Sequence, residues 1–432
     1  MFFKIYLMKN KVFQKMAFFA AFLMFQPIFG QKNDATLLEI LGKNNPKFEK
    51  ILANPEKYRV QIVYTQIDRD AQNRPTFTTH RFRADPKEYF YPASTVKFPA
   101  CLLALEKINH LNHIFKFDIQ KETPMFTDSV AAISDYPPQY LDTTSATKMP
   151  SIAHYVKKIL LVSDNDAFNR LYEFVGQEAF NKNLYLKNYK NLRIRHRLSI
   201  PMSAAENAQT NAVSFWKSGK TIYKQPEQIS AMRFDETPIS IGKGFMKGEK
   251  LVNEPFSFTF KNHFSLEDQQ RMLRAVLFPE ATPDEEKFDL TASDYDFLYR
   301  YMSMSPLESP SPRYPDADSA GAWDSYCKFL MFGNSKKPMP KNIRIFNKVG
   351  DAYGFLIDNA YVVDFERNVE FLLSATIYCN SDEIFNDDKY DYDTIGLPFM
   401  ADLGKTIYEY ECQRKRKFVP KLDNFKIDYS KY

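Results

Sequence analysis

A serine and a lysine three residues apart open an apolar stretch with helical spacing, and their side chains could act together in catalysis. Ser94 and Lys97 lie in the run from Tyr91 to Leu105, and residues at i and i+3 share one face of a helix. A serine hydroxyl becomes a good nucleophile only when a nearby base accepts its proton. A lysine can be that base when burial and neighbouring charge lower its pKa. The pair therefore indicates nucleophilic catalysis by Ser94.

The Ser-x-x-Lys spacing is weak evidence by itself, because roughly one or two chance matches are expected in a chain of this length. The surrounding sequence must therefore select among the matches. The spacing recurs at Ser145/Lys148, Ser214/Lys217 and Ser325/Lys328.

A second group of polar residues is the run Ser163, Asp164 and Asn165, which follows an apolar helical stretch. All three residue types are preferred at the N-cap of a helix, and capping is the simpler interpretation. A cap does not need three such residues in a row, so Ser163 and Asn165 could also face a cleft.

A third motif is Lys348, Val349 and Gly350, which continues the strand-like run Ile343–Phe346. The cation could hold a substrate carboxylate, and the glycine would let a substrate approach the strand backbone closely. A competing match, Lys217-Ser218-Gly219, follows what we interpret as the end of a helix, where glycine is a common C-cap. The strand context favours Lys348.

Three motifs in this order resemble the motif set of the penicillin-recognising serine hydrolases, and the class A β-lactamase-like branch is the most similar. The resemblance extends from about Leu37 to Glu411. It implies that Ser94 is the nucleophile, that Lys97 is its general base, and that the first product is an acyl-enzyme.

The resemblance also assigns the remaining site residues. Ser163 would pass a proton to the leaving nitrogen, with Lys348 beside it, and Asn165 would hold the amide of the substrate's acyl side chain. The backbone N–H groups of Ser94 and Asp351 would form the oxyanion hole, and Gly350 would lie against the substrate.

The sequence departs from the family pattern in two places. Val349 stands where the family has Ser or Thr, so a hydroxyl contact to a substrate carboxylate is lost. Class A enzymes carry a loop glutamate, followed a few residues later by an asparagine, that activates the deacylating water. This motif does not occur in the corresponding region of the sequence, where Glu206 is the only carboxylate between Glu178 and Glu227. Glu206 could take that role, but the alternative is a surface or helix-start residue.

The N-terminus has the pattern of a secretory signal peptide over residues 1–30, with lysines before the apolar run Met16–Phe25 and Gly30 as the small residue for cleavage. An uncleaved anchor is the alternative. Cleavage would remove four lysines and take the formal charge from +5 to +1 (5 − 4), which gives no case for nucleic-acid binding. We therefore expect a periplasmic or secreted protein without a stable membrane span after processing.

Hydrophobic periodicity in the 432 residues predicts an α+β fold, with two strands early, three late and a helical block between them. We expect a five-stranded antiparallel sheet flanked by the terminal helices, in a lobe of residues 31–92 and 341–432. An all-helical lobe would cover 93–340, with an insertion at about 217–261, and residues 31–432 would form one catalytic domain. The predicted strands are 59–68, 76–84, 343–349, 360–365 and 369–378; the main predicted helices are 36–58, 94–109, 152–161, 167–175, 266–277 (capped by Ser265), 290–304, 324–332 and 397–411.

These observations favour a serine hydrolase, with β-lactam hydrolysis as the specific activity. A cell-wall peptidase, transpeptidase or esterase of the same fold is the first alternative, and a penicillin-binding sensor without turnover is the second. The substrate would be a small molecule or a peptide, and no metal or organic cofactor is implied. The four cysteines have no metal-binding spacing. A basic run that includes Arg193, Arg195, His196 and Arg197 is either a solvated face or an attraction for an anionic substrate.

Overall fold

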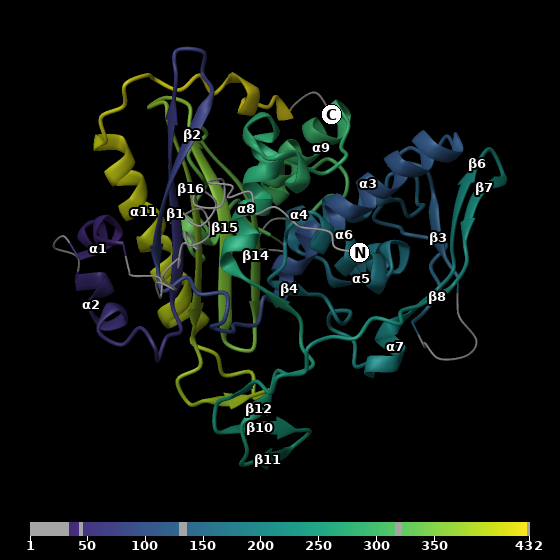
Figure 1. Cartoon of the computed structure of the whole chain (residues 1–432), viewed down its shortest axis with the longest axis horizontal. Coiled ribbons are helices and arrows are strands. Elements are labelled where there is room, and N and C mark those ends of the chain that lie inside the picture. The colour runs from purple at the N-terminus through teal and green to yellow at the C-terminus, as the bar shows by residue number, and fades with distance from the viewer. Residues whose placement is uncertain (1–33, 43–45, 129–135, 316–321, 430–432) are drawn as a thin grey trace, which may run out of the picture.

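A five-stranded antiparallel sheet forms the centre of one lobe and is built from both ends of the chain (Figure 1). The computed structural model describes residues 34–42, 46–128, 136–315 and 322–429. The strand order β14-β15-β16-β1-β2 places the late strands beside the early hairpin. The predicted α+β class and antiparallel sheet are confirmed. The strands are β1 (Gln61–Arg69), β2 (Pro75–Phe82), β14 (Ile343–Ala352), β15 (Phe355–Asp364) and β16 (Val369–Tyr378).

The connection between β14 and β15 is shorter than the sequence indicated. The predicted turn over residues 350–359 is wrong, since the strands are joined only at Tyr353 and Gly354, both at positive φ. The polar residues Asp358 and Asn359 suggested a loop, yet both are buried in β15. The Asp358 carboxylate accepts hydrogen bonds from the Asn347 side chain at 2.8 Å and from a backbone N–H at 2.9 Å, which offset the cost of burying it.

Helices cover both faces of this sheet. The early helices α1 (Ala35–Gly42) and α2 (Pro46–Leu52) and the last helix α11 (Leu397–Gln413) pack on one face in a common apolar core. Helix α8 (Leu266–Leu277) packs on the other face, against β1, β15 and β16. Coverage of the sheet by the terminal helices, as predicted, is what an apolar sheet face requires.

The second lobe is built around α3 (Lys97–Phe115), which is almost wholly buried along its first half. The lobe is mainly helical but also contains short strands, so the prediction of an all-helical lobe needs correction. Lys217-Ser218-Gly219 is the turn of a β-hairpin rather than a helix end, with Ser218 and Gly219 at positive φ. The predicted helix 324–332 is also reduced to α10 (Phe329–Phe332), with Met331 at positive φ. The other helices are α4 (Ile152–Val162), α5 (Asn165–Val175), α6 (Gln177–Leu186), α7 (Ala204–Ala208) and α9 (Ala292–Ser303), and the hairpin is β3 (Met125–Thr127), β6 (Val213–Lys217) and β7 (Lys220–Gln225).

The predicted insertion at 217–261 contributes to both lobes. Its first part completes the β6–β7 hairpin on the helical lobe, and its later part forms small ladders below the main sheet (Figure 1). These ladders pack Phe258 and Ile241 against Phe355 and Phe385 of the sheet lobe. The boundaries of the predicted lobes and of the insertion stay predictions. The short strands are β4 (Leu192–Arg193), β5 (Gln209–Thr210), β8 (Gln228–Ile229), β9 (Ser240–Ile241), β10 (Gly244–Lys247), β11 (Lys250–Val252), β12 (Phe256–Ser257), β13 (His263–Phe264) and β17 (Ile384–Phe385).

The predicted signal peptide lies outside the described residues. Within the described ranges, no helix has the length and apolar content needed to cross a membrane. All four cysteines are unpaired, and Cys101 and Cys379 are buried as expected of structural thiols.

Helix α11 approaches α10 so closely that a side chain at Gly404 would collide with the backbone nitrogen of Met331. Alanine normally stabilises a helix interior by about 1 kcal/mol over glycine. We predict the opposite sign here: Gly404→Ala should lower the free energy of unfolding by about 1–3 kcal/mol, because the overpacked helices must move apart. Urea unfolding would measure it, with Lys405→Ala on the exposed face of the same helix as the control. Stabilisation by Gly404→Ala would contradict the close packing.

Candidate active site

Ser94 lies in a single 3₁₀ turn, Ala93–Val96, that leads directly into α3. Ala93 precedes it with φ of 47°, a left-handed conformation that costs a non-glycine residue about 1–2 kcal/mol. Strain of this kind is held by the surrounding structure and is common at functional sites. The half-buried Ser94 is thereby presented at the start of a buried helix.

Strand β14 lies directly beside this turn, and Gly350 makes the approach possible. A Cβ at Gly350 would lie 2.9 Å from the backbone nitrogen of Ser94 and 2.9 Å from the carbonyl oxygen of Pro92. A glycine is therefore needed at position 350 because the backbone of the Ser94 turn lies so close. From the sequence alone, the glycine is instead explained by the close approach of a substrate. The close approach brings Ser94 and Asp351, whose N–H groups the sequence predicts to form an oxyanion hole, into the lining of the same cavities.

The run Ser163–Asn165 joins α4 to α5: Ser163 is the C-cap residue of α4, Asp164 is the N-cap residue of α5, and Asn165 begins α5. The Asp164 side chain accepts a hydrogen bond from the N–H of Ala167 at 2.8 Å. Ser163 ends α4 with φ of 60°, so its side chain and that of Asn165 are free to turn toward α3. Each of the two sequence interpretations therefore applies to part of this run. Asp164 caps a helix with its side chain, whereas Ser163 and Asn165 line a cavity beside Ser94.

Lys97 is fully buried and directs its amine at this turn. Its Nζ donates to Asn165 Oδ1 at 2.6 Å, to Ser163 Oγ at 3.3 Å and to the Ser163 carbonyl oxygen. Burial, reinforced by the positive charge of Lys348, lowers the pKa of Lys97 well below the ordinary value of a lysine. A shift in this direction favours the neutral amine, whose lone pair can accept a proton.

Lys348 reaches the same serine from β14. Its Nζ donates to Ser163 Oγ at 2.8 Å and to the Val349 carbonyl oxygen at 2.8 Å, and burial lowers the pKa of Lys348 as well. The Ser163 oxygen thus accepts hydrogen bonds from two lysines. Its own hydrogen must point elsewhere, which suits a residue that donates a proton to a leaving group.

Ser94 lines two cavities, one on each side of it. The first, of about 630 Å³, is lined by Ser163 and Val349, and we call it the leaving-group cavity because the sequence predicts Ser163 to be the proton donor to the leaving group. The second, of about 520 Å³, contains neither of these residues, and we call it the acyl cavity. Asn165 lines both cavities, and a substrate whose reactive carbonyl lies at Ser94 would extend into both.

Glu206 is not among the residues that line either cavity. It is the N3 residue of α7 in a capping box, where Ser203 and Glu206 each bind the other's backbone N–H. These hydrogen bonds lower the pKa of Glu206, as expected of a carboxylate that caps a helix. The structure thus gives Glu206 the helix-start role that the sequence left as an alternative, and does not place it to activate water at Ser94.

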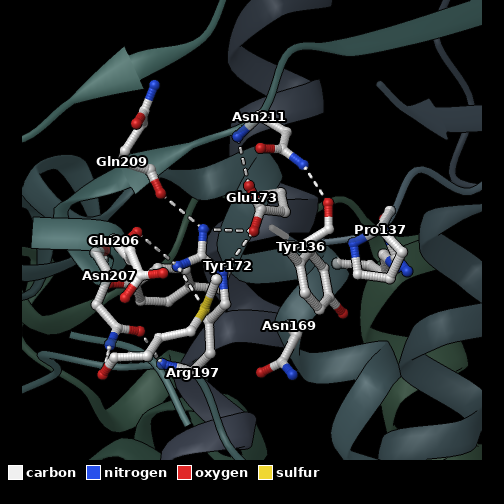
Figure 2. A network of polar contacts seen from close by, with 12 residues as sticks. Tyr136, Pro137, Asn169, Tyr172, Glu173, Arg197, Glu206, Asn207, Gln209 and Asn211 are labelled. Carbon is white, nitrogen blue, oxygen red and sulfur yellow. Dashed lines mark hydrogen bonds and ion pairs between the residues drawn. The ribbon is translucent and has the colours of Figure 1, made fainter. Parts of the chain in front are cut away.

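A buried ion pair that sequence reasoning missed holds the loop in which Glu206 lies (Figure 2). Arg197 donates to the Glu173 carboxylate at 2.6 Å, and its guanidinium also donates to the carbonyl oxygens of Gln209 and Glu206. The other Glu173 oxygen accepts from the backbone N–H of Asn211. Nothing in the sequence distinguished Glu173 within its helix, because its partner lies 24 residues away.

Residues 43–232 match the family model described as "Beta-lactamase enzyme family" (Beta-lactamase2). The matched region contains the motifs at Ser94 and at Ser163, and the motif at Lys348 lies beyond it. The match confirms the resemblance to the penicillin-recognising serine hydrolases that the three motifs carry. A search of curated proteins found no match.

Solved structures similar to this chain include several β-lactamases. The enzyme from Sphaerobacter thermophilus DSM 20745 is 12% identical, with 85% of this chain and 96% of that chain covered and a TM-score of 0.45. The enzyme from Streptomyces albus G is 13% identical, with 84% and 98% covered and a TM-score of 0.45. PBP-A is 13% identical, with 81% and 89% covered and a TM-score of 0.44.

The pH dependence of Ser94 acylation follows from the two lysines. The acylation rate constant should fall on acidification as Lys97 gains a proton, because a protonated amine cannot act as a base. It should be level around neutral pH, and fall again where Lys348 loses its charge. Stopped-flow measurement across the pH range would test this. A rate that keeps rising toward pH 10.5, the ordinary pKa of lysine, would contradict the proposed base.

The buried pair Glu173–Arg197 should be costly to break. Glu173→Gln leaves the Arg197 charge buried without its partner, so the free energy of unfolding should fall by about 3–5 kcal/mol. Urea unfolding would measure the change. Glu178→Gln on the neighbouring helix, which removes an exposed pair with Lys182, is the matched control and should have little effect. Equal effects of the two variants would show that the buried pair does not stabilise the loop.

Proposed function

We propose that this chain is a serine hydrolase of the penicillin-recognising superfamily that cleaves an amide or ester bond through an acyl-enzyme on Ser94. The observation that carries the proposal is the meeting of Lys97 and Lys348 on the Ser163 hydroxyl, which lines the leaving-group cavity together with Ser94. Lys97 follows Ser94 by three residues at the start of α3, and Ser163 shares the leaving-group cavity with Ser94, so candidates for the base and the proton donor that acyl transfer requires are both present.

Acylation can be written with the groups present. Neutral Lys97 accepts the Ser94 hydroxyl proton as Oγ attacks the substrate carbonyl carbon. The resulting oxyanion accepts hydrogen bonds from the N–H groups of Ser94 and Asp351. When the bond to the leaving nitrogen or oxygen breaks, Ser163 gives that atom its proton and takes up the proton held by Lys97, 3.3 Å away. Lys348 stabilises the negative charge on the Ser163 oxygen during this exchange.

Hydrolysis of the acyl-enzyme is less well supported by the site than its formation. In the described part of the chain, no glutamate lines either cavity beside Ser94, and the carboxylate of Asp164 is used in capping α5. A water molecule therefore lacks the glutamate base that the class A pattern supplies. We propose that β-lactams, the substrates favoured by the sequence, acylate Ser94 and are released slowly.

A second candidate function is that of a peptidase, transpeptidase or esterase of the same fold, and the leaving-group cavity favours it. Val349 presents methyl groups where a hydroxyl would bind the carboxylate of a penicillin. The cavity is also lined by Trp323 and Tyr326, and in the described chain no arginine or lysine is among its lining residues. A neutral or aromatic leaving group would fit these walls better than an anionic one.

Two further points are proposed separately: the cellular location of the protein, and the alternative that it is a penicillin-binding sensor without turnover. The pattern of residues 1–30 supports export to the periplasm or secretion. A sensor that binds a penicillin covalently without releasing it would use the same acylation chemistry. The persistence of the adduct distinguishes this sensor from an enzyme.

Intact-mass analysis of the mature protein exposed to a penicillin tests the proposal. We expect a long-lived adduct on the wild type and none on Ser94→Ala, because only the Ser94 oxygen forms the acyl bond. Rapid accumulation of ring-opened penicillin would instead indicate a β-lactamase with efficient deacylation. An identical adduct on both proteins would exclude Ser94, and an absence of adduct and product would direct the search to peptides and esters.

Glu206→Gln provides the matching test of deacylation. The lifetime of the acyl-enzyme should be unchanged, since Glu206 is used to cap α7 and lines neither cavity. A substantially longer lifetime in this variant would restore Glu206 as the base for the deacylating water.

A further inference from the structure

A third cavity, of about 770 Å³, continues the acyl cavity away from Ser94. The two share His196, Ile200, Pro201 and Lys261 in their walls. A substrate chain that passes these shared residues would leave the acyl cavity and enter the third. We call this third space the distal cavity.

Three cations line the distal cavity against one carboxylate. Arg195, Arg233 and Lys261 are the cations, and Glu236 is the carboxylate. The carboxylates near Ser94, Asp351 among them, line the acyl cavity and not the distal one. The acyl cavity, in contrast, is lined by two cations, Arg197 and Lys261, and by two carboxylates, Asp351 and Asp388. Among the lining residues, the excess of positive charge thus lies in the distal cavity.

Arg195 differs from the arginines beside it in the chain. Arg193 forms an ion pair with Asp235 at 2.8 Å, and Arg197 forms one with Glu173. Arg195 is only 7% exposed, yet in the described part of the protein it forms no ion pair. Its guanidinium donates to a backbone carbonyl and stacks between aromatic rings, and its Nε has no hydrogen-bond partner. Burial lowers the pKa of Arg195, and the charges of Glu236 and Asp235 oppose this shift without forming an ion pair. Burying a guanidinium that no carboxylate contacts directly is costly unless a bound anion compensates it.

Lys261 comes from the predicted insertion and is held between the two cavities. Its amine lies 5.2 Å from the ring centroid of Tyr353 and 5.7 Å from that of Phe256, and it donates to the Tyr353 hydroxyl at 3.2 Å. These contacts orient the amine without neutralising it, and Lys261 forms no ion pair with any residue that the structure describes.

His196 lines the distal cavity together with these two cations. One ring nitrogen contacts the Arg197 carbonyl oxygen at 2.6 Å, and the other accepts from the Asn262 N–H at 3.2 Å. Burial, together with the positive charges of Lys261 and Arg195, lowers the pKa of His196 to about 4. The imidazole therefore experiences the same positive surroundings that a bound anion would.

We propose that the distal cavity binds an anionic group, a carboxylate, at the far end of the substrate's acyl part, with Arg195 and Lys261 as its partners. This inference rests on the proposed acylation of Ser94. Because the distal cavity begins beyond His196, the carboxylate must be carried on an acyl chain of several atoms. The substrate class is then an ω-carboxyacyl compound or an acyl peptide with a side-chain carboxylate, joined to an uncharged leaving group.

Two esters that differ only in the terminal carboxylate test the assignment: 4-nitrophenyl hexanoate and the mono-4-nitrophenyl ester of adipic acid. Acylation is followed by nitrophenolate release, with Ser94→Ala as the blank. We expect the wild type to acylate at least about tenfold faster with the adipate, and this ratio to fall with added salt. In Arg195→Gln and in Lys261→Gln the ratio should approach one. Lys247→Gln, the same charge change in the insertion at an exposed position lining neither cavity, should keep the wild-type ratio.

The ratio within each variant is independent of the amount of folded protein, and Lys261→Gln serves if Arg195→Gln folds poorly. Equal rates with the two esters in the wild type, with the Ser94→Ala blank inactive, would overturn the anion site and leave acylation at Ser94 intact. A preference for adipate that survives both substitutions would overturn these two partners. If neither ester acylates the protein, simple esters are not substrates and the proposed anion site in the distal cavity is rejected. The intact-mass experiment with a penicillin would still test acylation of Ser94 separately.

Discussion

The burial of two lysines on one serine hydroxyl is the constraint on which the site depends. Taking an ammonium group out of water costs several kcal/mol, and Lys97 and Lys348 repel each other as well. The cost is reduced by hydrogen bonds to Ser163 and Asn165, and burial lowers the pKa of both lysines. The same desolvation that destabilises the charged amine makes it a base, so the unfavourable burial is also the source of the proposed reactivity.

This constraint links the two lobes. Lys97 belongs to the helical lobe and Lys348 to the edge strand of the sheet, and they meet only because Gly350 lets β14 lie against the Ser94 turn. The two turns at the meeting point hold Ala93 and Ser163 in left-handed conformations. Such strain persists where surrounding packing determines the backbone, and the buried start of α3 provides that packing.

The loop between α6 and the β6–β7 hairpin lies beside the site but does not supply a base for the deacylating water. The Glu173–Arg197 pair holds this loop in place beside the acyl cavity, yet Glu206 within it caps a helix. The loop instead contributes Arg195 to the distal cavity. In our proposal, this segment has a greater part in selecting the acyl group than in hydrolysing the acyl-enzyme.

Local patterns in the sequence were sufficient to predict the sheet strands, the Ser265 cap of α8 and the three motifs, because spacing and capping preferences act over a few residues. Local patterns gave wrong predictions where the structure depends on residues far away in the chain. Asp358 and Asn359 were predicted to lie in a turn, but they are buried residues of β15. The hairpin turn at Lys217 was predicted to be the end of a helix, because the sequence does not show that β6 pairs with β3 and β7. The pairing of Glu173 with Arg197, the lone charge of Arg195 and the two cavities at Ser94 depend on side chains far apart in the chain. The sequence alone thus determined which chemical groups are present and on which elements they lie. Only the tertiary structure decided which of them meet, because burial, and with it each group's pKa and its need for a partner, is a property of the packed protein.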